Sequence, residues 1–265
     1  MNSFVAGASS GIGQAVAEQL LQRGDHVAVT ARRAERLEAI KGALACPGDL
    51  KKSTDIAAAL ARANEVYPGI DRLYNFAGGA LLLDPQAELT PEITERIREL
   101  VELNTMGSVR LLKQALPYLN EGAHVGICSS LITQTDQPVL AGTAIYYWTK
   151  KLMESALNSQ RQMLADRGIS LTIIRPGLVD TEAWRAAGKE TWQGVPDVVR
   201  LVGRVGFKAS DCAKQLIADT EAGKELSFPT LDSKLASEHP RIHEAMLRLG
   251  SPILERTLRR PNKLK

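Results

Sequence analysis

Short apolar runs alternate with helical hydrophobic patterns along most of this 265-residue chain. Apolar residues such as Ile12, Val16 and Leu20 recur at helical spacing between the runs. Strands that alternate with helices imply βαβ units, whose right-handed crossovers give a parallel sheet with helices on both faces. We therefore predict an α/β fold with a doubly wound parallel sheet. The runs with strand character lie at residues 3–6, 26–31, 72–77, 124–130, 170–176 and 225–229.

The alternation predicts one domain over residues 1–231 and a helical, then basic, C-terminal extension over residues 232–265. Residues 182–206 interrupt the rhythm and are interpreted as a short substrate lid. Hydrophobic residues form 44% of the chain and charged residues 24%, which is typical of a globular protein. Although the net charge is +3, five basic side chains lie in the last ten residues, so the body is slightly acidic. This balance argues against a nucleic-acid-binding face.

The three cysteines, Cys46, Cys128 and Cys212, are far apart and lack the paired spacing of a metal site. Isolated thiols of this kind are typical of a reducing compartment. The N-terminus has no signal-peptide pattern, and no run approaches the roughly 18 apolar residues of a membrane span. We expect a cytoplasmic protein that holds no metal and does not contact a membrane.

The stretch GASSGIG lies between the first predicted strand and the first predicted helix. Its glycines allow a tight turn close to a pyrophosphate, and the helix N-terminus supplies free N–H groups. The Gly-x-x-x-Gly-x-Gly spacing resembles the cofactor turn of the short-chain dehydrogenase/reductase family, which has a Rossmann-type fold. The family usually has a threonine where Ala6 stands. The resemblance implies cofactor contacts from Gly7, Ser9, Ser10, Gly11, Ile12 and Gly13.

The end of the second predicted strand bears on the choice of dinucleotide. A carboxylate there would bind the ribose 2′-hydroxyl of NAD(H), whereas an arginine accommodates the 2′-phosphate of NADP(H). The sequence has Arg32 and Arg33 and no carboxylate at this place, and a guanidinium suits phosphate. We therefore predict NADP(H), with NAD(H) as the alternative. By resemblance, Asp49 contacts the adenine.

Further segments resemble the family in their order along the chain. NFAGG resembles its Asn-Asn-Ala-Gly, with Phe76 in place of the second asparagine. Asn104, inside a predicted helix, matches an asparagine that supports a proton-relaying water. PGLVDT resembles the family's Pro-Gly-x-Val-x-Thr, which lies over the nicotinamide. The resemblance implies cofactor contacts from Asn75, Ala77, Gly78, Pro176, Gly177, Val179 and Thr181.

The stretch AIYYWTKKL resembles the family's Tyr-x-x-x-Lys and permits two registers. The first pairs Tyr146 with Lys150 and places Thr149 where the family has serine; the second pairs Tyr147 with Lys151. We favour the first. Residues four apart share a helix face, so the lysine can lie beside the tyrosine. A nearby ammonium, aided by a cationic nicotinamide, should lower the phenol pKa from its ordinary value near 10.

A phenol tuned in this way can act as a general acid in reduction and a general base in oxidation. The serine that would bind the substrate oxygen is Ser129 or Ser130, and we favour Ser130 because the second serine usually has this role in similar sequences. The resulting catalytic set is Ser130, Tyr146, Lys150 and Asn104, and the resemblance implies that Tyr146 and Lys150 also contact the cofactor.

This set predicts an NADP(H)-dependent oxidoreductase that transfers a hydride between the nicotinamide and a small carbonyl or secondary alcohol substrate. Two alternatives are a dinucleotide-binding redox sensor without turnover and a non-redox epimerase or dehydratase on the same fold. In the family, helices corresponding to residues 92–119 and 146–167 often pack between subunits. The resemblance therefore implies a homodimer or homotetramer.

Overall fold

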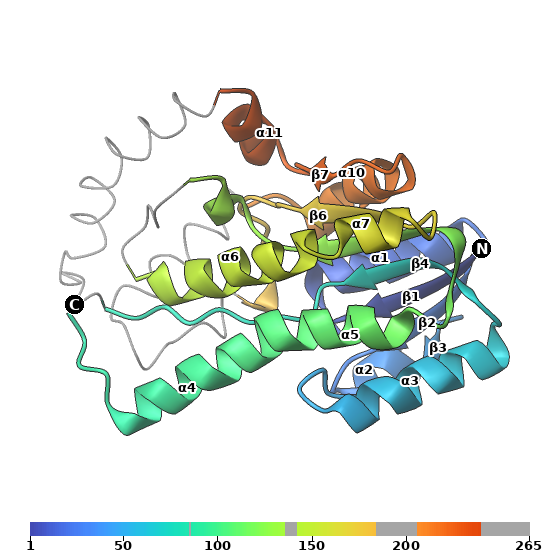
Figure 1. Ribbon diagram of the computed structural model, residues 1–265, viewed down its shortest axis with the longest axis horizontal. Coiled ribbons are helices and arrows are strands. Elements are labelled where there is room, and N and C mark those ends of the chain that lie inside the picture. Colours follow the sequence, from blue (N-terminus) through green and yellow to red (C-terminus); the bar gives the residue numbers. More distant parts are fainter. Residues whose placement is uncertain (85, 136–141, 184–205, 240–265) are drawn as a thin grey trace, which may run out of the picture.

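The computed structural model describes residues 1–84, 86–135, 142–183 and 206–239 (Figure 1). Within these residues, seven strands form a single sheet in the order β3-β2-β1-β4-β5-β6-β7, and all neighbouring strands are parallel. The predicted doubly wound α/β fold is confirmed. The strands are β1 (Asn2–Ala6), β2 (His26–Thr30), β3 (Leu44–Ala45), β4 (Ile70–Asn75), β5 (Leu119–Cys128), β6 (Ser170–Ile174) and β7 (Leu226–Ser227).

Helices cover both faces of the sheet (Figure 1). Buried side chains of α1 and α10 pack against one face, and those of α3, α5 and α6 pack against the other. The π-helical turn η1 (Glu102–Met106) joins α4 to α5, and the short turn η2 (Leu131–Gln134) follows β5. The helices are α1 (Gly11–Gln22), α2 (Ala34–Glu38), α3 (Ser53–Val66), α4 (Pro91–Val101), α5 (Gly107–Ala115), α6 (Ala144–Asn158), α7 (Arg161–Ala165), α10 (Ala209–Glu221) and α11 (Leu231–Glu238).

Successive side chains of the central strand β1 point to opposite faces of the sheet. Phe4 belongs to the core under α3 and α5, whereas Val5 belongs to the core under α1 and α10. Burying apolar side chains of this size contributes roughly 1.5–3 kcal/mol each. Because the strand order reverses between β1 and β4, their carboxyl ends border a crevice, which is where parallel α/β folds bind ligands.

Some expectations from the sequence differ from the structure in detail or lie outside the described residues. The helix expected around Asn104 contains the π-helical turn η1. The C-terminal helix α11 begins at Leu231, one residue before the expected extension, and residues 240–265 lie outside the described residues. Nearly all of the expected lid, residues 184–205, also lies outside them. Among the described helices, none is long and apolar enough to cross a lipid bilayer.

Candidate active site

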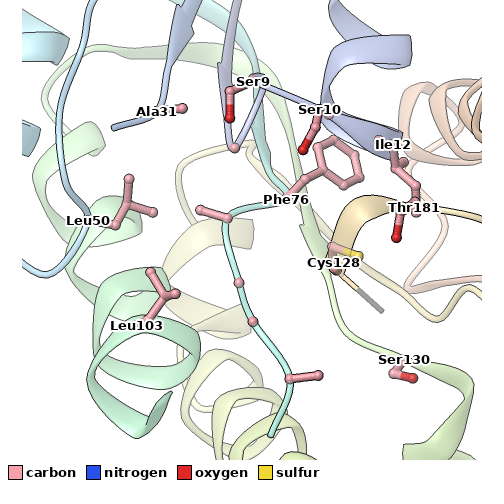
Figure 2. A pocket seen from close by; sticks show the side chains of 18 of the residues that line it. Ser9, Ser10, Ile12, Ala31, Leu50, Phe76, Leu103, Cys128, Ser130 and Thr181 are labelled. Carbon is pink, nitrogen blue, oxygen red and sulfur yellow. The ribbon is translucent and has the colours of Figure 1, made fainter. Parts of the chain in front are cut away.

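A cleft opens at the carboxyl ends of the central strands (Figure 2). Its walls come from the turn after β1, the ends of β2, β4, β5 and β6, and the start of α6. Of the residues predicted from the sequence, the cleft brings together all except Asn75 and Asn104. Those that line it are Gly7, Ser9, Ser10, Gly11, Ile12, Gly13, Arg32, Arg33, Asp49, Ala77, Gly78, Ser130, Tyr146, Lys150, Pro176, Gly177, Val179 and Thr181.

The glycine turn packs too closely for side chains. Gly7 has a φ of 78° and donates its N–H to the Thr30 carbonyl at 2.8 Å. A Cβ on Gly13 would overlap the Gly7 carbonyl oxygen, and a Cβ on Gly7 would overlap the backbone of Ala77. The turn therefore needs glycine at both positions to bring the start of α1 beside the end of β4.

The N-terminus of α1 faces the cleft, and in the described part of the chain its backbone N–H groups are not capped by the N-cap side chain. Within the described residues, the Ser10 hydroxyl at the N-cap position does not cap the helix and instead accepts a hydrogen bond from Arg33 Nη2 at 3.1 Å. The first turn of α1 also contains no acidic side chain. Uncapped N–H groups and the positive end of the helix dipole suit a phosphate group.

Two arginines extend this positive region. Arg33 directs Nη2 to Ser9 Oγ at 2.9 Å, so its guanidinium lies against the glycine turn. Arg33 Nη1 and Arg36 Nη1 donate to the two carboxylate oxygens of Glu182 at 2.9 Å and 2.6 Å. These hydrogen bonds lower the pKa of Glu182 to about 2. Arg36 was not among the predicted site residues, although it lies three positions after Arg33.

The two predicted asparagines lie behind the cleft wall. Asn75 is buried and uses its amide inside the protein, donating to Ser108 Oγ at 2.9 Å and accepting from Ala77 N at 2.9 Å. Asn75 ends β4, and its side chain fixes the backbone turn that follows the strand. Its contact with the cofactor stays a prediction.

Asn104 is fully buried within η1. Its Oδ1 accepts from Gly79 N at 2.9 Å, and its Nδ2 donates to the Gly79 carbonyl at 3.0 Å and to Thr149 Oγ1 at 3.0 Å. A Cβ added to Gly78 would lie 3.1 Å from Asn104 Oδ1 and 3.5 Å from Lys150 Nζ. Asn104 thus ties the chain after β4 to α6 directly beside the lysine.

The serine pair after β5 divides between two environments. Ser129 is buried and donates to Glu154 Oε1 at 2.5 Å. Both serines line the cleft, and Ser130 lies at the end remote from Ser9 and Ser10 (Figure 2). Glu154 also accepts two hydrogen bonds from Arg175, whose Nη2 lies 2.6 Å from Oε2. This ion pair holds the backbone that carries Ser130.

The two tyrosines of AIYYWTKKL face different ways. Tyr146 and Lys150 line the cleft, with Lys150 Nζ 5.8 Å from the centroid of the Tyr146 ring. Tyr147 is buried away from the cleft and donates to the Thr135 carbonyl at 3.1 Å. Lys150 Nζ donates to the Cys128 carbonyl at 2.8 Å. The predicted register, Tyr146 with Lys150, is the one that reaches the cleft.

The expected lowering of the Tyr146 pKa does not occur in the protein alone. Burial raises the pKa of Tyr146 above its ordinary value, the neighbouring Cys128 raises it further, and the hydrogen bond with Ser130 lowers it. Burial also lowers the pKa of Lys150, while Cys128 and Glu154 raise it. Desolvation is the largest effect on the phenol, and the residue spacing that predicts the neighbouring lysine does not reveal it.

The segment after β6 closes the opposite wall. A Cβ on Gly177 would overlap the carboxylate of Asp232, and Asp232 Oδ2 accepts from Leu178 N at 2.9 Å. Gly177 N also donates to Thr230 Oγ1 at 2.9 Å. The start of α11 therefore fixes the Pro-Gly turn.

The site contains residues that the motif analysis missed. Cys128 reaches the cleft from the end of β5, one residue before the serine pair (Figure 2). Its place at a central strand end was the only sequence signal for it. The roles of Glu154, Glu182 and Asp232 depend on contacts between distant segments, for which the sequence carries no local signal.

Comparison with known proteins identifies the family of this chain. The family model described as short chain dehydrogenase matches residues 2–192. A curated oxidoreductase from Staphylococcus epidermidis, itself uncharacterized, is 30% identical over 184 residues, which cover 68% of this chain and 78% of that protein. A 1-hydroxy-2-glutathionyl-2-methyl-3-butene dehydrogenase from a Rhodococcus species is 29% identical over 180 residues, with the same coverage of both chains.

Solved structures give the same result for the fold. A short-chain dehydrogenase from Streptomyces avermitilis is 26% identical and superposes with a TM-score of 0.75, covering 97% of this chain and 98% of its own. A short chain dehydrogenase from Burkholderia cenocepacia, solved in complex with NADP, is 20% identical with a TM-score of 0.74 and covers 98% of both chains. At that identity the second likeness concerns the fold alone.

Proposed function

The chain belongs to the short-chain dehydrogenase family of oxidoreductases, and from this premise we propose that it is an NADP(H)-dependent enzyme acting on a carbonyl or secondary alcohol. The observation that carries the proposal is the convergence of Tyr146, Lys150 and Ser130 in the cleft that also contains the glycine turn. The Rhodococcus relative, named as a dehydrogenase of a 1-hydroxy compound, supports the choice of a hydroxyl or carbonyl substrate.

The residues present fit a nicotinamide dinucleotide. The side-chain-free turn from Gly7 to Gly13 and the uncapped start of α1 would hold the pyrophosphate. Arg33, with the additional Arg36, would hold a 2′-phosphate, since guanidinium groups bind phosphate in two-point contacts. This pair of cations, with no carboxylate at the end of β2, is the reason to propose NADP(H) over NAD(H). Asp49, which lines the cleft beyond β3, is proposed to contact the adenine.

When bound, the cofactor supplies or accepts the hydride at its nicotinamide ring. In the reducing direction, Tyr146 donates its phenol proton to the substrate oxygen; in the oxidising direction it accepts that proton. A phenol is protonated at neutral pH, and burial favours this form of Tyr146 further by raising its pKa in the protein alone, which suits the reducing direction. In the reducing direction, negative charge develops on the substrate oxygen, and the proton from Tyr146 neutralises it.

Ser130 and Lys150 orient this transfer. We assign substrate binding to Ser130, because both serines line the cleft but the Ser129 hydroxyl already donates to Glu154. Lys150, held by the Cys128 carbonyl beside the Tyr146 ring, places a cation next to the proton donor. Asn104 is proposed to hold the chain beside Lys150 in the position needed for a proton relay.

The matched residues of AIYYWTKKL provide the test. NADPH absorbance is followed with a panel of ketones, diketones, quinones and aldehydes, using wild type, Tyr146→Phe and the control Tyr147→Phe. Tyr146→Phe should lose about 100-fold or more in kcat while keeping its NADPH affinity, since general acid catalysis contributes roughly 10²–10⁴-fold. Tyr147→Phe, which removes the hydroxyl that donates to the Thr135 carbonyl outside the cleft lining, should retain activity.

The same assay separates the other readings of this site. Lys150→Met should lose turnover as Tyr146→Phe does, and Lys151→Met should resemble wild type. Equal loss in both tyrosine variants would contradict the assigned register. Tight NADPH binding without turnover on any substrate would favour the redox-sensing alternative. Product formation without net NADPH consumption would favour an epimerase or dehydratase.

We also propose that the protein forms a homodimer or homotetramer in the cytoplasm. Two large apolar side chains on the outer face of α6, Trp148 and Leu152, are more than half exposed. Their exposure one helical turn apart supports an interface along this helix, because exposed apolar patches often mark protein–protein contacts. The free thiols of Cys46, Cys128 and Cys212 support a reducing compartment. Sedimentation velocity of wild type and Trp148→Glu tests the interface; a wild-type monomer would contradict it.

A further inference from the structure

A carboxylate from the segment after β6 contacts Arg33 and Arg36, the arginine pair of the cofactor cleft. Glu182 follows β6 and lies 149 residues from Arg33. Its Oε2 accepts from Arg33 Nη1 at 2.9 Å, and its Oε1 accepts from Arg36 Nη1 at 2.6 Å. One carboxylate thus spans two guanidinium groups, in the same two-point manner as a phosphate group would.

The remaining donors of Arg33 point to the glycine turn. Arg33 Nη2 contacts Ser9 Oγ and Ser10 Oγ at 2.9 Å and 3.1 Å, and Nε contacts Ser9 Oγ at 3.3 Å. The guanidinium that bonds to Glu182 is therefore the one that borders the cofactor turn. An anion that bound Arg33 and Arg36 together would meet the Glu182 carboxylate on the same N–H groups.

Glu182 remains negatively charged under all ordinary conditions. The two arginine hydrogen bonds lower its pKa to about 2, so neutral buffers do not discharge it. A carboxylate next to a phosphate is repelled, whereas a carboxylate next to a hydroxyl can accept its hydrogen bond. The two dinucleotides differ at this one position, because NADP(H) carries a 2′-phosphate where NAD(H) carries a 2′-hydroxyl.

We propose that Glu182 is a specificity-determining residue of the cofactor site, whose carboxylate competes with the 2′-phosphate of NADP(H) for Arg33 and Arg36. The inference deepens the proposed function and rests on it. Glu182 lowers the affinity for NADP(H) selectively, because NAD(H) has no phosphate that needs the arginine pair. Arg33 and Arg36 then favour binding of the 2′-phosphate, and Glu182 opposes it. The balance between these three side chains sets the strength of the preference for NADP(H).

The size of the effect follows from the exposure of the three groups. Their side chains are 40–44% exposed, and exposed ion pairs contribute little because water and salt screen them. Release of two such pairs corresponds to about a two- to tenfold change in affinity at low ionic strength. The change should shrink as salt is added.

The test compares Glu182→Gln with wild type by fluorescence titration of NADPH and NADH. Glu35→Gln serves as the matched control, because Glu35 is an exposed carboxylate on α2 between the two arginines, and its loss changes the net charge equally. Adenosine 2′,5′-bisphosphate and 5′-AMP are titrated in the same way, since this pair isolates the 2′-phosphate from the nicotinamide half. Binding is the readout, so no substrate is needed.

The proposal expects Glu182→Gln to bind NADPH and adenosine 2′,5′-bisphosphate about two- to tenfold more tightly, with NADH and 5′-AMP unchanged or weaker. Glu35→Gln should change the NADPH to NADH ratio by less. An unchanged ratio in Glu182→Gln, or equal weakening of both dinucleotides, would overturn the proposal while leaving the proposed function intact. Failure of wild type to bind either dinucleotide would overturn both.

Discussion

Neutralising Glu154 should destabilise the fold through the ion pair that supports the catalytic loop. Its carboxylate accepts hydrogen bonds from Ser129 Oγ at 2.5 Å, Thr133 Oγ1 at 2.6 Å and Arg175 Nε and Nη2 at 3.0 Å and 2.6 Å. In Glu154→Gln, an amide NH₂ replaces one oxygen and must face at least one of these donors. The variant therefore loses a hydrogen bond and leaves the Arg175 charge without its partner.

The structure sets the magnitude of this loss. Breaking a buried ion pair by removing one partner costs roughly 3–5 kcal/mol. The side chains of Glu154 and Arg175 are only 6% and 15% exposed, and Arg175 keeps a second hydrogen bond to Gln134 Oε1 at 2.8 Å. We therefore expect the lower end, about 3 kcal/mol in the free energy of unfolding. With an m value of about 3 kcal/mol/M, the urea midpoint falls by about 1 M.

Urea denaturation followed by circular dichroism measures this shift, and a double variant serves as its control. Replacing both partners, as Glu154→Leu with Arg175→Met, removes the two charges together and should be less destabilising than the sum of the single replacements. A midpoint shift below about 0.3 M in Glu154→Gln, or strict additivity in the double variant, would refute the assigned role of the ion pair.

Three further outcomes follow from the site. Gly13→Ala should weaken dinucleotide binding about tenfold or more in a fluorescence titration, because its Cβ would overlap the Gly7 carbonyl oxygen; unchanged affinity would contradict the close packing of the turn. Asn104→Ala should lower the free energy of unfolding by about 3 kcal/mol in the urea assay, since three hydrogen bonds of a buried amide are lost; a loss below 1 kcal/mol would contradict it. Above pH 10, wild type should lose stability relative to Tyr146→Phe by about 1.4 kcal/mol per pH unit, because the raised pKa keeps the folded phenol protonated while the unfolded one ionises; parallel pH profiles would contradict the raised pKa.

The sheet and the glycine turn could be predicted because their signals are local. Strand alternation and the spacing of Gly7, Gly11 and Gly13 specify a βα unit without reference to the rest of the chain. The strand β3 gave no clear apolar run, since it pairs over only two residues, Leu44 and Ala45. The π-helical turn η1 was not predicted, because its hydrophobic pattern also fits an ordinary α-helix.

The parts of the site that escaped prediction depend on distant contacts or on burial. Glu182 and Arg33 are 149 positions apart in the sequence, and no local pattern around either residue predicts their ion pair. The direction of the Tyr146 pKa required knowledge of its burial, whereas sequence spacing supplied only the neighbouring lysine. Asn75 matches a family position, yet its amide serves the protein's own backbone.

Hydride transfer itself is the most direct measure of the central proposal. A substrate from the carbonyl panel is reduced with NADPH that carries deuterium at both C4 positions of the nicotinamide, and the product is examined by mass spectrometry. The account predicts one deuterium on the carbinol carbon of the wild-type product, and a label transfer rate lowered about 100-fold or more in Tyr146→Phe. A product formed without the label, or transfer at an undiminished rate in Tyr146→Phe, would contradict the proposed chemistry.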